Sequence, residues 1–213
     1  MEVPGPVGQA VLRATQAPSS PVRRLFKAFA HGLARLLVLP IVGSYRLRRA
    51  MLGDQAFRAS SHWLSRIPGL GGDYLRAAFY EATLERFGRD VRVEFGTIFS
   101  TPAARVGDQV YVGAYCVIGN VDIEADVLLG SGVHLLSGQG QHGIDDLDRP
   151  IRSQPGEFAR IRIGGDTWIG NAAVVMANVG RQCVIGAGSV VTRDVPDLSI
   201  AAGNPARVLR SRA

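Results

Sequence analysis

An aliphatic residue recurs at intervals of six through the C-terminal half of this chain. Twelve positions carry the repeat: Val106, Val112, Ile118, Ile123, Leu129, Leu135, Ile163, Ile169, Val175, Val179, Ile185 and Val191. Gly follows the aliphatic residue at eight of these twelve positions, against a usual Gly frequency of about 7%. Composition alone does not produce such a pattern, so the sequence repeat indicates a structure built of repeating units.

A short strand and a corner every six residues, three times per turn, build a triangular solenoid. The aliphatic residues point into a narrow axial core, and Gly permits the tight corners. Small or β-branched residues four positions later fill the crowded sides, and Cys116 and Cys183 are among them. The sequence therefore predicts a mainly β fold, a parallel β-helix over residues 91–200, in which both thiols are inert core groups.

The N-terminal part has a different character. Residues 1–20 are rich in Pro, Gly and Ser and predict a loose tail. Residues 21–90 predict a helical, basic extension, and residues 201–213 a C-terminal tail. Residues 1–53 carry a net charge of +7, which leaves −1 for residues 54–213. Any surface that binds a partner through positive charge therefore belongs to the N-terminal quarter of this chain. No nucleic-acid-binding motif accompanies that charge.

Apolar residues from Val22 onward have helical spacing, at positions 22, 25, 26, 29, 33, 36, 37 and 40, and Arg24, Lys27, His31 and Arg35 lie on the other side. This pattern is typical of an amphipathic helix on an anionic membrane, with contact through residues 22–49. The alternative is a helix that packs this apolar stripe on the rest of the protein. A second helix is predicted over Tyr74–Phe87, with Asp73 as N-cap and Gly88 as its stop.

The longest uncharged apolar run, Leu36–Tyr45, contains Pro40 and predicts no membrane span, which needs about 20 residues. We expect no export signal. Two cysteines 67 residues apart fit neither a disulfide framework nor a metal site, so the expected compartment is the cytoplasm.

Three stretches are the most specific in the chain: residues 164–171 (GGDTWIGN), 185–194 (IGAGSVVTRD) and 201–210 (AAGNPARVLR). With them the chain resembles the hexapeptide-repeat acyltransferases, which include maltose, galactoside and xenobiotic O-acetyltransferases. The resemblance covers roughly residues 91–210. It implies a left-handed β-helix, a homotrimer with sites between subunits, and acetyl-CoA as co-substrate without a metal.

The repeat is interrupted after Leu135 by a 24-residue segment, 137–160, and a loop of that length in a compact domain is usually functional. Members of the family carry a catalytic His at the start of such a loop, which implies that His142 is the general base. Imidazole titrates near neutral pH, as proton removal from an attacking hydroxyl requires. The competitor is His134, at the end of a repeat unit. Asp145, Asp146 or Asp148 could orient the imidazole, and the sequence does not choose among them.

The resemblance also implies residues that contact CoA, by position in the family motifs: Asn171, Ala187, Thr192, Arg193, Arg207 and Arg210. At position 193 Arg stands where the family has Lys, which keeps the charge and changes its geometry. An ordinary solvated tail is the alternative for Arg207 and Arg210. The sugar contact of the family's early repeats is not matched, since this chain has Gly113, Ala114 and Tyr115 there.

The predicted function is transfer of a short acyl group from CoA to a hydroxyl of a sugar, in a polysaccharide or lipid-linked precursor at the inner membrane face of a bacterium. Two alternatives remain at this stage. One is a trimeric solenoid scaffold without catalysis. The other is a metal hydratase like the γ-carbonic anhydrases, which needs three His ligands, whereas the solenoid has only two His.

Overall fold

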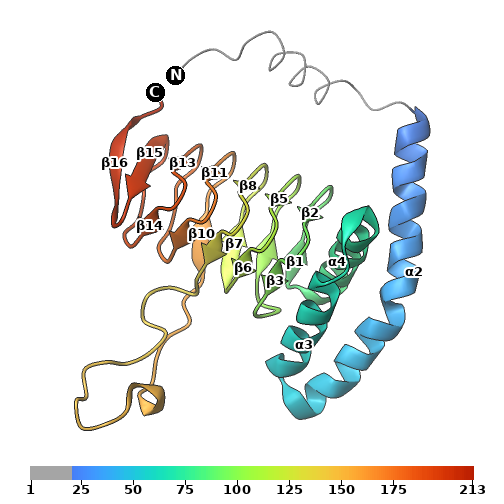
Figure 1. The fold of residues 1–213 in the computed structure, drawn as a ribbon, viewed down its shortest axis with the longest axis horizontal. Helices are drawn as coiled ribbons and strands as arrows, with labels where there is room; N and C mark the ends of the chain where they lie inside the picture. Colours follow the sequence, from blue (N-terminus) through green and yellow to red (C-terminus); the bar gives the residue numbers. More distant parts are fainter. Residues whose placement is uncertain (1–20) are drawn as a thin grey trace.

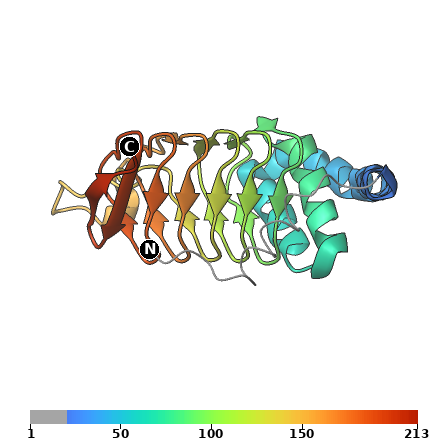
Figure 2. The same ribbon diagram turned by 90° about the horizontal axis from the view of Figure 1, so that it is seen from above.

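A computed structural model describes the fold of residues 21–213. The tail predicted for residues 1–20 and the side chain of Arg24 lie outside the described part. Three helices are followed by a parallel β-helix of about six turns, and the helices cover one end of it (Figures 1 and 2). The predicted fold class, a parallel β-helix with a helical N-terminal extension, is confirmed.

Three sheets form the sides of the solenoid. Sheet A contains β1 (Arg86–Phe87), β4 (Arg105–Val106), β7 (Val121–Ile123) and β10 (Ile161–Ile163). Sheet B contains β2 (Arg92–Val93), β5 (Tyr111–Val112), β8 (Leu128–Leu129), β11 (Trp168–Ile169), β13 (Val184–Ile185), β15 (Ser199–Gly203) and β16 (Ala206–Ser211). Sheet C contains β3 (Ile98–Phe99), β6 (Val117–Ile118), β9 (His134–Leu135), β12 (Val174–Val175) and β14 (Val190–Val191). All neighbours are parallel except β15 and β16.

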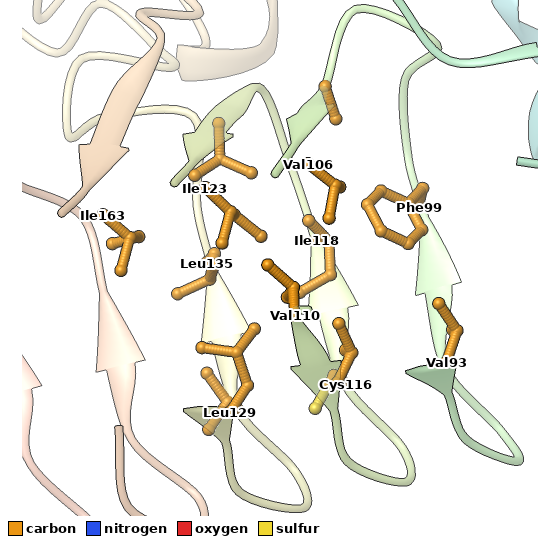
Figure 3. Close-up of a cluster of buried hydrophobic side chains, with 14 of the residues drawn as sticks. Val93, Phe99, Val106, Val110, Cys116, Ile118, Ile123, Leu129, Leu135 and Ile163 are labelled. Carbon is orange, nitrogen blue, oxygen red and sulfur yellow. The ribbon is translucent and has the colours of Figure 1, made fainter. Parts of the chain in front are cut away.

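The second residue of most strands points into the axial core. All twelve aliphatic positions of the repeat are at most 1% exposed, and they stack in columns from one turn to the next (Figure 3). Cys116 and Cys183 are fully buried between turns, as predicted, and burial raises the pKa of both thiols. A thiolate is therefore disfavoured at either position.

Two of the three corners have a constant length. The step from sheet A to sheet B and the step from B to C are six residues in every turn, as from Val106 to Val112 to Ile118. The step from C to A varies: seven residues from Phe99 to Val106, five from Ile118 to Ile123, and 28 from Leu135 to Ile163. The long insertion and the other departures from six-residue spacing thus fall at one corner.

The helices differ from the sequence prediction in their bounds. The helix α2 (Pro21–Leu52) continues through Pro40, and α3 (Asp54–Ser65) was not predicted. The helix α4 (Gly69–Thr83) begins after Pro68, so Asp73 is not its N-cap, and Phe87 belongs to β1. Leu25–Leu52 of α2 is long and apolar enough to cross a membrane by length and composition. The prediction that this region is too short to span was therefore wrong.

The helix α2 packs on the protein with a different side from the apolar stripe that the sequence predicts. The predicted apolar stripe faces outward, since Phe26, Phe29 and Leu36 are each about two-thirds exposed. A second stripe, Ala34, Val38, Val42 and Tyr45, packs in the core instead. On the same side, Lys27 pairs with Asp90 and Arg35 with Glu81, so part of the basic face contacts the protein's own acidic groups. Packing of the predicted stripe on the protein is contradicted.

Arg76 of α4 joins the helices to the first turn of the solenoid. Its fully buried guanidinium donates to the backbone oxygens of Val93 at 3.0 Å and Ile67 at 2.7 Å, and to Asp73 at 2.7 Å. Burial lowers the pKa of Arg76. Tyr80 lies beside it, with its hydroxyl 2.8 Å from Ser61 Oγ, and burial raises the pKa of Tyr80 to about 12.

We expect Arg76→Ala to lower the free energy of unfolding by about 2–5 kcal/mol, because it leaves buried carbonyl groups without a donor and opens a cavity. Urea unfolding followed by circular dichroism measures the change. The matched control is Arg58→Ala on α3, where the side chain is exposed and the change should stay within about 0.5 kcal/mol. Equal effects of the two substitutions would contradict this role of Arg76.

Candidate functional site

The predicted site residues surround sheet C. Its outer face is a strip of partly exposed side chains, Ile98, Val117, His134, Val174 and Val190, which alternate with the core residues. One edge of this strip is the corner between sheets B and C, and the other edge is the corner of variable length. Candidate residues lie at both edges.

The corner between B and C carries Asn171 and Ala187, which are exposed and stand on successive turns. Asn171 Oδ1 accepts from Ser131 N at 3.1 Å, and the backbone oxygen of Asn171 accepts from Gly188 N at 2.8 Å. Gly130, Gly170 and Gly186 let successive turns stack closely at this corner, because a Cβ at Gly170 would lie 2.5 Å from Ala187 N. The glycines thus serve the packing between turns, and the exposed side chains of Asn171 and Ala187 form the outer edge.

Thr192 and Arg193 lie at the opposite edge, directly after β14. Arg193 is exposed, and Thr192 is partly exposed. The side-chain amide of Gln139 donates to the Thr192 carbonyl, so the beginning of the long loop is fixed beside Arg193. The structure therefore brings Gln139, at the beginning of the His142 loop, close to Arg193, a predicted CoA-binding residue. The two residues are 54 positions apart in the sequence.

The loop leaves the solenoid after β9 and projects from its side (Figure 1). Its two arms are held together by Glu157 N, which donates to the Gly140 oxygen at 2.7 Å. Further out, the buried side chain of Gln154 donates to the oxygens of Asp146 and Arg149 and accepts from Asp146 N. These contacts give a loop without strands a defined shape. His142 lies in the sequence between Gly140 and Asp146, which take part in these two sets of contacts, and it is exposed.

Arg160 fixes the far end of the loop. Its guanidinium donates to Asn120 Oδ1 at 3.0 Å and to the Ala103 oxygen at 2.8 Å, and it pairs with Glu85. Together with Arg105, it holds the pKa of the Glu85 carboxyl below its usual range. Both ends of the loop are therefore tied to the solenoid, one through Gln139 and the other through Arg160.

In the described part of the chain, no carboxylate of Asp145, Asp146 or Asp148 makes a hydrogen bond to His142. Asp146 Oδ1 accepts from Asp148 N at 3.1 Å instead, and Asp145 is exposed. His134 stands on β9 between Val117 and Val174, in the middle of the strip. The two histidines thus differ in setting: His134 is part of a regular turn, and His142 is on the loop.

Arg207 and Arg210 lie on β16, which pairs antiparallel with β15 at the C-terminal end of the solenoid. Arg207 stands opposite Ala202, and Arg210 opposite Ile200, with a register shift between Ile200 and Ala201. Since Ala201 points into the core, Ile200 and Ala202 share the outer face. The bulge therefore places both arginines on one face, although they are three residues apart.

The predicted site residues fall into separate groups in the structure. The structure brings together Asn171 with Ala187, Thr192 with Arg193, and Arg207 with Arg210, but no contact joins His142 to any of these three pairs among the described residues. Sequence reasoning missed Gln139, Gln154 and Arg160, which shape the loop. Only their positions within the insertion pointed to them, because no periodic pattern exists there.

A hollow of about 600 Å³ lies at the remaining corner, between sheets A and B, and none of the predicted residues lines it. Its lining carries the carboxylates of Glu124, Asp126, Asp166 and Asp197 against the guanidinium groups of Arg86 and Arg181, a net charge of −2. An acidic hollow disfavours phosphate groups, so the candidate residues around sheet C fit the predicted chemistry better. Within residues 21–213, no group of three or more His, Cys, Asp or Glu side chains is placed to hold a metal ion.

Comparisons with known proteins agree with this fold. A family model described as hexapeptide repeat of succinyl-transferase matches residues 103–137 and 160–193. The probable acetyltransferase Rv3034c of Mycobacterium tuberculosis is 37% identical over 51% of this chain, and the match spans 37% of that relative. The chain thus covers well under two-thirds of that protein's length.

Among solved structures, a maltose O-acetyltransferase from Clostridium difficile 630 superposes with a TM-score of 0.66 at 22% identity, over 74% of this chain and 86% of that one. AntD, an N-acyltransferase from Bacillus cereus in complex with dTDP and 3-hydroxybutyryl-CoA, has a TM-score of 0.50 at 13% identity, over 62% and 86%. At these identities the likeness concerns the fold. The repeat and the fold together confirm the resemblance to hexapeptide-repeat acyltransferases.

Proposed function

We propose that this hexapeptide-repeat protein is a CoA-dependent O-acyltransferase that moves an acetyl or other short acyl group to a hydroxyl of a sugar. The observation that carries the proposal is the arrangement around sheet C. A loop that is held at both ends and carries an exposed His leaves one edge of the strip, and the corner with exposed Asn171 and Ala187 forms the other. The acetyltransferase names of similar proteins, and the acyl-CoA held by AntD, support the same chemistry.

The residues present suit an acyl-CoA. Asn171 and Ala187 would line the pantetheine arm, where backbone groups can approach closely. Exposed Arg193, Arg207 and Arg210 would bind the phosphorylated adenosine end, because guanidinium groups form strong paired hydrogen bonds with phosphate. Thr192 adds a hydroxyl at the same edge.

We further propose a homotrimer, with each site between two subunits. The outer faces of sheets B and C are mainly apolar, and Leu128 and Trp168 on sheet B are about half exposed. Sheet A instead presents Arg105, Asp122 and Arg162, which take part in ion pairs. A closed ring uses two different faces of each subunit, and faces B and C fit that use.

In the proposed reaction His142 removes the proton of the acceptor hydroxyl as its oxygen attacks the thioester carbonyl. The C–S bond then breaks, the acyl group stays on the acceptor oxygen, and the CoA thiolate receives the proton from the imidazolium. Backbone N–H groups near the carbonyl would stabilise the oxyanion. A covalent acyl-enzyme is not required, since both substrates bind together.

The proposed acceptor is a carbohydrate, within a polysaccharide or a lipid-linked precursor. We assign the enzyme to the cytoplasm, at the inner face of the membrane. The acceptor assignment follows from the sugar acetyltransferases that share the fold, and the membrane assignment from α2.

The donor can be tested by thermal unfolding with and without acetyl-CoA. At about 100 times its Kd, the ligand should add roughly 2.7 kcal/mol to the free energy of unfolding. The gain should shrink in Arg193→Ala, and it should persist in Arg58→Ala, an exposed arginine on the helical cap. A folded trimer without any shift would oppose the proposal and favour a scaffold.

His142→Ala should lower turnover by roughly 10²- to 10⁴-fold, because general-base catalysis typically contributes that much. Acyl transfer can be followed by release of the free CoA thiol in a screen of sugar acceptors. His134→Ala is the matched control and should retain most of the activity. Near wild-type turnover of His142→Ala would remove this residue from the mechanism.

Subunit mixing tests the shared site. His142→Ala and Ala187→Arg each remove one part, the base or the open corner, and each homotrimer should be inactive. If the two parts of a site come from different chains, trimers re-formed from an equal mixture should regain about a quarter of the wild-type activity. Absence of recovery in verified mixed trimers would place both parts of the site in one chain.

A further inference from the structure

The helix α2 presents an uncharged surface along its whole outer side. We call this surface the apolar arc. It consists of twelve exposed residues: Val22, Leu25, Phe26, Phe29, Leu33, Leu36, Leu37, Pro40, Gly43, Ser44, Leu47 and Met51. At 100° per residue these positions fall within one-third of the helix circumference. A 32-residue helix is about 48 Å long at 1.5 Å per residue, which makes the arc a large apolar patch.

The helix α2 is also the outermost layer of the molecule. The helices α3 and α4 lie between it and the first turn of the solenoid (Figures 1 and 2). The buried stripe of α2, with Val38, Val42 and Tyr45, faces these helices, so the apolar arc points away from the body. Contacts between solenoid sides in a trimer would leave this end surface open.

We infer that the apolar arc binds the surface of a lipid bilayer, with α2 parallel to it. Charge favours an anionic surface, because α2 contains seven Lys or Arg residues and no Asp or Glu. Lys27 and Arg35 pair with the protein's own carboxylates, whereas Arg46, Arg48 and Arg49 form no ion pair within the described residues. Arg48 lies next to one edge of the arc and Arg46 beyond the other, where their guanidinium groups can reach lipid phosphates, whereas Arg49 lies on the opposite side of the helix.

Trp63 extends the surface onto α3. Its side chain is 59% exposed and lines a shallow hollow with Pro40, Ile41 and Arg48. An exposed indole next to an apolar helix face and a basic residue is typical of protein surfaces at the membrane–water interface. Residues of α2 and α3 thus form one surface with an apolar centre and a basic, aromatic margin.

The contacts of α2 with the rest of the protein argue against a transmembrane orientation of this helix. To cross a bilayer, α2 would have to withdraw Val38, Val42 and Tyr45 from the core and break the pairs Lys27–Asp90 and Arg35–Glu81. Shallow binding of the arc keeps all of them. The inference does not depend on the proposed acyl transfer, since it rests on the surface of the helical cap alone.

The test is flotation of the full-length protein with phosphatidylcholine vesicles, with and without phosphatidylglycerol. Removal of residues 1–53 would be a poor variant, because it takes the buried stripe out of the core. Phe29→Glu places a charge in the middle of the arc, and Ala28→Glu places the same charge at the neighbouring exposed position outside it. Both variants should keep the wild-type melting temperature.

We expect wild-type protein to float with both vesicles, and more strongly with the anionic ones. Phe29→Glu should weaken binding by roughly tenfold or more, since it removes one inserted aromatic side chain. Ala28→Glu should bind within about threefold of wild type. Wild-type protein that stays in solution with both vesicles would overturn the inference. If sedimentation then shows larger assemblies that Phe29→Glu dissociates, the arc is a contact between copies of this chain.

Discussion

The axial core of the solenoid admits one inward side chain per short strand, and the rest of the structure depends on this constraint. Each inward residue, such as Ile123, Ile163 and Val179 on one side, packs on its counterparts one turn above and below. Two corners hold the chain to six residues per step, because an added residue there would turn the next side chain out of the core. Only the corner between sheets C and A varies in length, and the loop with His142 leaves from it.

The solenoid could be predicted for the same physical reason. Its contacts repeat from turn to turn, so the same pattern of an aliphatic residue, usually followed by Gly, recurs along the chain. Twelve copies of this pattern make it recognisable in a single sequence. The loop could be located as the place where the pattern fails, and His142 was identified there by resemblance. Its shape could not be predicted, since Gln139 contacts Thr192 and Arg160 contacts Glu85 across 53 and 75 residues.

The helices show where pattern reasoning fails. Two sides of α2 are apolar, one around Phe29 and one around Val38, and their spacing alone fits either as the packed side. The choice depends on groups far along the chain: Tyr45 of the second side packs on Phe57 and Phe79 in the core. The ion pairs of Lys27 with Asp90 and of Arg35 with Glu81 accompany this orientation. The helix α3 was missed because Ser60 and Ser61 stand at buried positions, where they bond to Arg48 and Tyr80.

The two proposals together limit which part of an acceptor can react. Turns of a β-helix rise about 4.8 Å each, and helix layers are about 8–10 Å apart. The His142 loop leaves the third turn, beyond α3, α4 and α2, so it stands roughly 20–30 Å from the apolar arc. In a trimer with parallel solenoid axes, three arcs would face one bilayer and bind cooperatively, which would hold the axes upright. A sugar attached directly to a lipid headgroup would then lie below the site, whereas an extended saccharide would reach it. Membrane attachment at α2 therefore favours reaction at sugars far along a polymeric acceptor over reaction at the first sugar, which is attached to the lipid.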